Sequence, residues 1–100
     1  MTDATPPKPV PLEGLHFNMV DLHMALAWVK ERPSVRLLVM TDHRYVPETL
    51  EIYPPGSEAP RWCLWRDYEG RLHVDDWVRS EFDLPYLNLV EALGFITSNL

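Results

Sequence analysis

The sequence predicts a small α+β domain: a two-layer sandwich in the order α-β-β-β-β-α, with a mainly antiparallel meander and both helices on one face. Two segments of helical periodicity lie towards the ends of the chain, at 16–34 and 82–100. Short apolar or alternating runs, separated by turn residues, fill the region between them. A length of 100 residues, with 46% apolar and 24% charged side chains, is typical of one globular domain.

The first 14 residues differ from the rest, since they carry four prolines and a glycine among polar side chains. They predict an extended N-terminal arm, followed by a single domain at 15–100. The arm is either a disordered tail or a segment that docks on this protein or a partner, because polyproline conformations lose little entropy on binding. The chain start lacks the apolar stretch of a secretion signal and Cys63 is the single cysteine, so we expect a cytoplasmic protein.

The segment 16–34 predicts the first helix. Asn18 can cap it, Asp21 lies in its first turn near the positive end of the dipole, and Pro33 stops it. The apolar side chains form two stripes, which are Met19, Leu22, Leu26 and Val29 on one side and Val20, Met24, Ala27 and Trp28 on the other. Because a surface helix ordinarily has one apolar stripe, this helix is either sandwiched in the core or presents one stripe to another molecule.

Two strands are expected between the first helix and the proline-rich loop at 54–60. The continuous apolar run at 35–41 predicts a strand that is buried on both faces. Pro47 confines Tyr45–Val46 to an edge segment, because proline cannot donate to a central ladder. Residues 49–53 alternate, which places Leu50 and Ile52 on one face.

The stretch RWCLWRDYEGRLHVDDW at 61–77 predicts a β-hairpin. Asp67 and Gly70 fit positions i and i+3 of a type I turn, with a bulge at the glycine and with Asp67 facing Arg71. In this register one face carries Trp62, Leu64, Leu72 and Val74, and the other carries Cys63, Trp65, His73 and Asp75. A two-residue turn at Glu69–Gly70 would shift the pairing by one and mix these sets, so we prefer the first register.

The segment 82–100 predicts the last helix, with Asp83 just before its first turn and Pro85 within that turn. Its apolar stripe comprises Tyr86, Leu89, Val90, Leu93 and Ile96. Gly94 either ends this helix or weakens it.

Three groups of residues contain side chains that could support catalysis or metal binding. Cys63, His73 and Asp75 share one predicted face and match a thiol nucleophile, its base and an orienting carboxylate, but their diagonal spacing is loose and no oxyanion hole is evident. His16, His23, His43 and His73, with Cys63 and Asp75–Asp76, lack the spacing of a zinc site, so we predict no metal. Asp75 and Asp76 point to opposite faces of a strand and cannot act as a pair.

The net charge of −6 argues against direct nucleic-acid binding but permits docking on a basic partner. Tryptophan, tyrosine and arginine dominate interface hot spots, so surface aromatics and their neighbours indicate contact with a partner. The predicted partner-binding residues are Trp65, Tyr68, Arg66, His73, Asp75, Trp28, Met24 and Val20. The competing interpretation is that the arm or residues 41–48 fold over them.

We therefore predict a small, acidic, non-enzymatic protein that binds a macromolecular partner. It would act as an inhibitor or regulatory subunit on a basic, nucleic-acid-binding surface, by compositional analogy with phage-borne inhibitors of host defence. A homodimer through the first helix stays open, and we expect no cofactor and no membrane contact. The alternative is a small enzyme or ligand-binding module that uses the Cys63–His73–Asp75 face.

Overall fold

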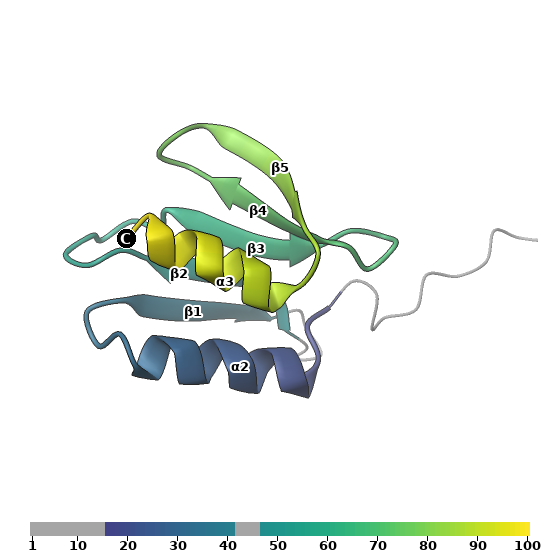
Figure 1. The fold of residues 1–100 in the computed structure, drawn as a ribbon, viewed down its shortest axis with the longest axis horizontal. Helices are drawn as coiled ribbons and strands as arrows, with labels where there is room; N and C mark the ends of the chain where they lie inside the picture. The colour runs from purple at the N-terminus through teal and green to yellow at the C-terminus, as the bar shows by residue number, and fades with distance from the viewer. Residues whose placement is uncertain (1–15, 42–46) are drawn as a thin grey trace, which may run out of the picture.

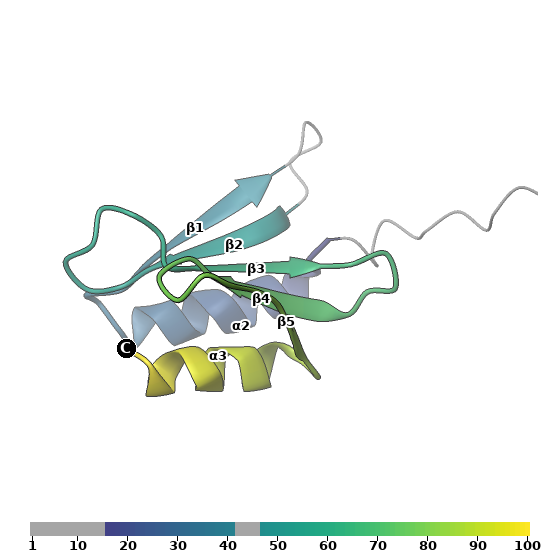
Figure 2. The same cartoon turned by 90° about the horizontal axis from the view of Figure 1, so that it is seen from above.

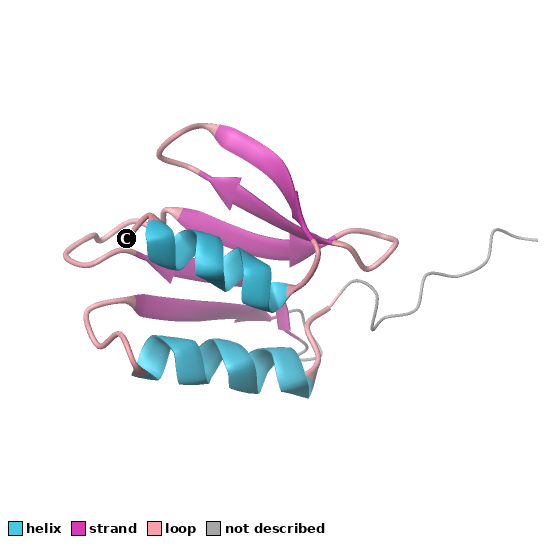
Figure 3. Ribbon diagram, in the orientation of Figure 1, coloured by secondary structure: helices cyan, strands magenta, loops and turns pink. Residues whose placement is uncertain are grey.

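The computed structural model describes residues 16–41 and 47–100, and it has the predicted α+β architecture (Figure 1). The elements are α2 (Met19–Lys30), β1 (Arg36–Thr41), β2 (Pro47–Tyr53), β3 (Trp62–Arg66), β4 (Leu72–Asp76), β5 (Glu81–Tyr86) and α3 (Leu89–Ser98). The strands form one antiparallel sheet in the order β1-β2-β3-β4-β5, so each pairs with its neighbour in the chain (Figure 3). Both helices lie on one face of this sheet, as predicted (Figure 2).

The core lies between the sheet and the two helices. The sheet contributes a set of nearly inaccessible side chains, which are Leu50, Ile52, Trp62, Leu64, Leu72 and Val74. The helices contribute Ala25, Leu89, Ala92, Leu93 and Ile96. The alternation predicted for β2, β3 and β4 is therefore confirmed, because every second residue of these strands faces the helices.

The β3–β4 hairpin has the predicted turn and register. Gly70 donates its amide to the Asp67 carbonyl at 2.9 Å and has a φ of 79°, a conformation that favours glycine. The pairing of Cys63 with Asp75 and of Trp65 with His73 follows. The expected charge pair between Asp67 and Arg71 does not form, because Arg71 pairs with Glu69 and Asp67 accepts backbone amides within the turn.

Helix α2 begins as predicted, with a capping box between Asn18 and Asp21. It is not sandwiched in the core, because only Asp21 and Ala25 are buried and the two apolar stripes lie on either side of them. Asp21 tolerates this position since Arg66 donates to its carboxylate at 2.8 Å. The outer members of the stripes are exposed: Met19 at 63% and Val20 at 68%.

The prediction that the strand at 35–41 is buried on both faces is wrong. β1 forms one edge of the sheet, and Leu38 and Met40 are 46% and 41% exposed on the face opposite the helices. Leu37 and Val39 point the other way and pack on the core. An apolar run cannot distinguish a central strand from an edge strand when the sheet order is unknown. The expected edge segment Tyr45–Val46 and the arm at 1–14 lie outside the described residues.

The C-terminal segment contains a fifth strand that was expected to be part of the last helix. Pro85 lies in β5, where an edge position tolerates a residue without an amide hydrogen. The helix starts later because Asn88 caps it, accepting from the Glu91 amide at 2.9 Å. Gly94 does not end α3, which continues to Ser98. None of the described helices is long and apolar enough to cross a membrane.

A buried ion pair joins three distant parts of the chain. Arg61, immediately before β3, donates to both carboxylate oxygens of Asp76 at 3.2 Å, and Asp76 is fully buried at the end of β4. Arg61 also donates to the backbone carbonyl of Asn99, beyond α3. Asp76 in turn accepts the amides of Val78 and Arg79, which shapes the β4–β5 turn. This cluster holds one end of the sheet against the C-terminus.

Candidate interaction face

The face of the sheet opposite the helices is not covered by any described helix or strand (Figure 2). The residues that alternate with the buried core positions of β2, β3 and β4 lie there, and they are Thr49, Glu51, Cys63, Trp65, His73 and Asp75. We call this set the open face. It includes the mixed face that was predicted for the hairpin, so that part of the prediction is confirmed.

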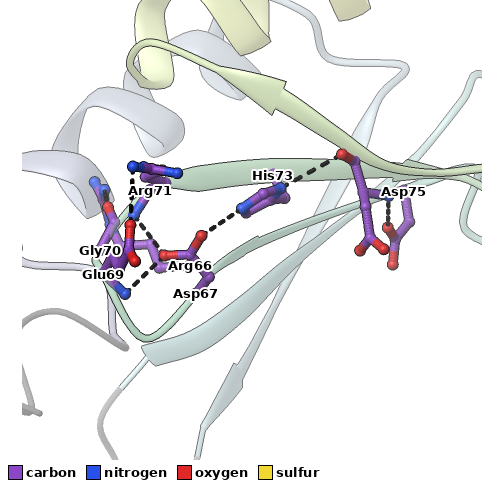
Figure 4. A network of polar contacts seen from close by, with 8 residues as sticks. Arg66, Asp67, Glu69, Gly70, Arg71, His73 and Asp75 are labelled. Atoms are coloured by element: carbon purple, nitrogen blue, oxygen red, sulfur yellow. Dashed lines mark hydrogen bonds and ion pairs between the residues drawn. The ribbon is translucent and has the colours of Figure 1, made fainter.

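An aromatic pair occupies the middle of the open face. The rings of Trp65 and His73 stack across β3 and β4, with centroids 4.5 Å apart and planes inclined by 17°. His73 Nε2 lies 2.8 Å from a carboxylate oxygen of Asp67, and this bond is drawn in Figure 4. The bond from His73 lowers the pKa of the Asp67 carboxyl below its ordinary value, and the Arg71 and Glu69 amides lower it further. The His73 imidazole is thus fixed by the Trp65 ring against one of its faces and by the Asp67 carboxylate at its edge.

The polar contacts continue from His73 to Asp75 through β5 (Figure 4). His73 Nδ1 approaches the Asp83 carbonyl at 3.5 Å, and the Asp83 amide donates to Asp75 at 2.9 Å. Asp83 has a φ of 60°, a left-handed conformation that is uncommon for a residue other than glycine. This kink brings the Asp83 backbone within reach of both side chains.

Cys63 lies between two carboxylates on the open face. Burial raises the pKa of its thiol to about 11, and the negative charges of Asp75 and Glu51 act in the same direction, against a weaker effect of the Thr49 hydrogen bond. The alternative grouping of Cys63, His73 and Asp75 does not form a hydrogen-bonded triad, because His73 is bonded to Asp67 and Asp75 is bonded to the Asp83 amide. A thiol with a raised pKa is a poor nucleophile at neutral pH.

The native thiol of Cys63 is expected to react slowly with iodoacetamide. Its pKa of about 11 lies two pH units above the ordinary value of 9.0, so the thiolate fraction at neutral pH is about one hundredth of normal. Alkylation at pH 7.5, followed by mass spectrometry, should therefore be about a hundredfold slower in the native protein than in denaturant.

Two charge variants check the cause of this slow reaction. Replacing Glu51 with Gln removes one negative charge beside the thiol and should speed the alkylation. Replacing Glu69 with Gln, on the exposed hairpin turn, should leave it unchanged. A native thiol that reacts as fast as in denaturant would contradict the raised pKa and restore the case for a reactive cysteine.

The predicted partner-binding residues do not form one surface. Trp65, His73 and Asp75 lie on the open face, and Tyr68 is exposed at the tip of the adjoining turn. Arg66 points to the helix side, where it bonds Asp21 and the Gly70 carbonyl.

The three predicted residues from α2 belong to the helix layer. Met24 and Trp28 line a groove between α2 and α3, and Trp28 Nε1 donates to the Thr97 hydroxyl at 3.0 Å. Val20 is exposed on the same helix. The predicted set therefore divides between opposite sides of the domain.

Sequence reasoning did not select the exposed aromatic pair at the β4–β5 turn. Trp77 and Phe82 are 56% and 51% exposed, and their rings meet edge to face with centroids 5.6 Å apart. Val78, in the same turn, is also exposed. One feature of the sequence could have indicated this exposure. Trp77 directly follows the predicted strand and precedes a polar turn, so its side chain lies beyond the part of the strand that packs on the core.

The described residues contain no group of three or more histidine, cysteine or acidic side chains placed to hold a metal ion. No family model matches the chain, and comparisons with curated proteins and with solved structures give no significant match.

Proposed function

We propose that this protein is a non-enzymatic binding protein whose open face docks on a basic surface of a macromolecular partner. The partner surface would be one that otherwise binds nucleic acid, so that the protein acts as an inhibitor or regulatory subunit. The supporting observation is the strand register, which places the carboxylates of Glu51 and Asp75 on either side of Cys63 on the open face. Two neighbouring carboxylates give this face a negative potential, which attracts a cationic surface.

The distribution of the described cations supports the same assignment. Arg61 and Arg66 are engaged with acids on the helix side of the sheet, and they do not neutralise the open face. Arg36 shares the side of the sheet opposite the helices, but it lies on the edge strand β1, above the ring of Tyr53. Trp65, stacked on His73, adds an aromatic ring to the open face, and tryptophan is among the residues that carry binding energy at interfaces.

The test begins with the partner recovered by pull-down from the native host and continues with purified components. Glu51→Lys reverses a charge on the open face, and it should slow association by about tenfold at low salt. Glu58→Lys makes the same charge change in the exposed β2–β3 loop and should leave the rate unchanged. Nucleic acid should compete with the wild-type protein for the partner.

Two outcomes would contradict the proposal. One is equal association of the Glu51→Lys and wild-type proteins, and the other is simultaneous binding of nucleic acid and this protein to the partner. If the pull-down yields no protein partner and the purified protein converts a small molecule in a reaction that depends on Cys63, the alternative of an enzyme is favoured.

A further inference from the structure

The two edges of the sheet differ in their capacity to accept another strand. β5 carries Pro85, which has no amide hydrogen, and its pairing with β4 shifts register between Val74 and Asp76. Such features protect an edge from further pairing. β1 has no proline or acidic side chain, since residues 36–41 read RLLVMT. Its pairing with β2 shifts register only at the last pair, between Met40 and Thr41, so residues 36–40 form a regular edge. An edge strand of this kind leaves alternate backbone amides and carbonyls available to a strand from another molecule.

A groove runs beside the β1 edge, between β1 and the last turn of α2. Its apolar lining includes Val29 from the helix and Leu37 and Leu38 from the strand. In Figure 1, α2 lies alongside β1 at the margin of the sheet. A strand added to β1 would therefore have a helix flanking one of its faces, and its alternate side chains would contact the Val29 side of α2.

The groove carries positive charge on a protein that is acidic overall. Lys30 and Arg36 both line it, and no acidic side chain does. Within the described residues, only Lys30, Arg36 and Arg79 among the lysines and arginines lack an ion pair. Two of these three cations thus line one groove. Arg36 also donates to the Ser57 carbonyl at 3.0 Å and lies over the Tyr53 ring, so Lys30 and the remaining guanidinium nitrogens are the groups that a carboxylate ligand would meet.

We propose that the β1 edge and the groove beside α2 bind an extended, acidic segment of a partner protein by strand addition. The segment pairs with the backbone of β1, alternates apolar side chains towards α2, and places a carboxylate beside Lys30 and Arg36. A second copy of this chain fits less well, since its own β1 has no acidic side chain to neutralise these cations. This site lies at the edge of the sheet and is independent of the function proposed for the open face.

The test uses a displayed library of random octapeptides selected on the purified protein. Enriched sequences should alternate apolar residues and carry Asp or Glu near one end. In ¹⁵N spectra, the selected peptide should shift the amides of β1 and of the α2 C-terminus. Two synthetic versions of the peptide, each N-methylated on one alternate set of residues, test whether it binds by strand addition. Only every second amide of an added strand donates to β1, so one set should abolish binding and the other should leave it intact.

Matched charge variants test the electrostatic part of the inference. Lys30→Glu should weaken peptide binding about fivefold to tenfold, while Arg79→Glu, which reverses the remaining unpaired cation at the distant β4–β5 turn, should not. Circular dichroism establishes that both variants are folded.

Several results would overturn the inference. They are the absence of any enriched peptide, equal binding by both N-methylated sets, equal binding by the two charge variants, and amide shifts confined to the open face or to the α2–α3 groove. Concentration-dependent dimerisation in light scattering, with protection of the β1 amides from exchange, would assign the edge to a second copy instead.

Discussion

Replacing Asp76 with Asn is expected to lower the free energy of unfolding by about 3 kcal/mol or more, because it leaves the Arg61 guanidinium partly buried without a counter-charge. Asp76 is fully buried and accepts both Arg61 bonds at 3.2 Å. Asparagine keeps the volume and can still accept the Val78 and Arg79 amides, so the substitution isolates the charge. Urea denaturation followed by circular dichroism measures the change.

The exposed Arg71–Glu69 ion pair supplies a control with the same chemistry. Both of its side chains are mostly in solvent, so Glu69→Gln should change stability by about 0.5 kcal/mol or less. Similar small effects of Asp76→Asn and Glu69→Gln would show that the buried pair contributes no more than a surface pair.

The Asp76 pair also predicts a decline of stability in acid. Burial alone raises the pKa of this carboxyl, but the bonds from Arg61 and from the Arg79 and Val78 amides together outweigh burial, so the pKa lies below its ordinary value. A group with a lowered pKa stabilises the folded state above its unfolded pKa, near 4, and this contribution is lost as pH falls through the folded value. The Asp76→Asn protein should show a flatter pH dependence below about pH 4.

Replacing Arg66 with Met is expected to cost about 2–3 kcal/mol, since it strands the Asp21 carboxylate between α2 and the sheet. The Arg66 guanidinium bonds Asp21 and the Gly70 carbonyl at 2.8 Å and lies 5.4 Å from the Phe17 ring centroid. The double replacement Asp21→Leu with Arg66→Met should recover most of this loss. It removes both charges, and it fills the space with apolar groups next to the two stripes of α2.

A double-mutant cycle in urea measures this coupling. The recovery should be incomplete by about 0.5–1 kcal/mol, because Asp21 also accepts the Asn18 amide in the capping box. A double variant that loses as much stability as the sum of both single variants would show that the two residues act independently.

Much of the fold follows from local features of the sequence. The hairpin at Asp67–Gly70, the cap at Asn18 and the alternation of Leu50 and Ile52 depend on neighbours in the chain, and each was predicted correctly. The fifth strand was missed because Pro85 suits both the first turn of a helix and an edge strand. The sequence offers two acceptable N-caps for the last helix, Asp83 and Asn88, and the structure uses Asn88.

The composition of the open face was predictable, but its connections were not. The register placed Trp65 and His73 together, since opposite residues of an antiparallel pair are neighbours. The bond between His73 and Asp67 depends on the side-chain rotamer at the turn, which no periodicity specifies. The burial of Asp21 depends on Arg66, 45 residues away, so the helix periodicity alone could not indicate that Asp21 faces the sheet.

The strictly sequential order of the sheet has a consequence for how the chain folds. Each strand finds its partner by closing a short loop, so the sheet can grow hairpin by hairpin with little loss of loop entropy. The hydrogen bond between Trp28 and Thr97, by contrast, joins residues 69 positions apart and links α2 to α3. Docking the two helices against each other is thus the step with the largest entropic demand, and we expect it to follow the assembly of the sheet.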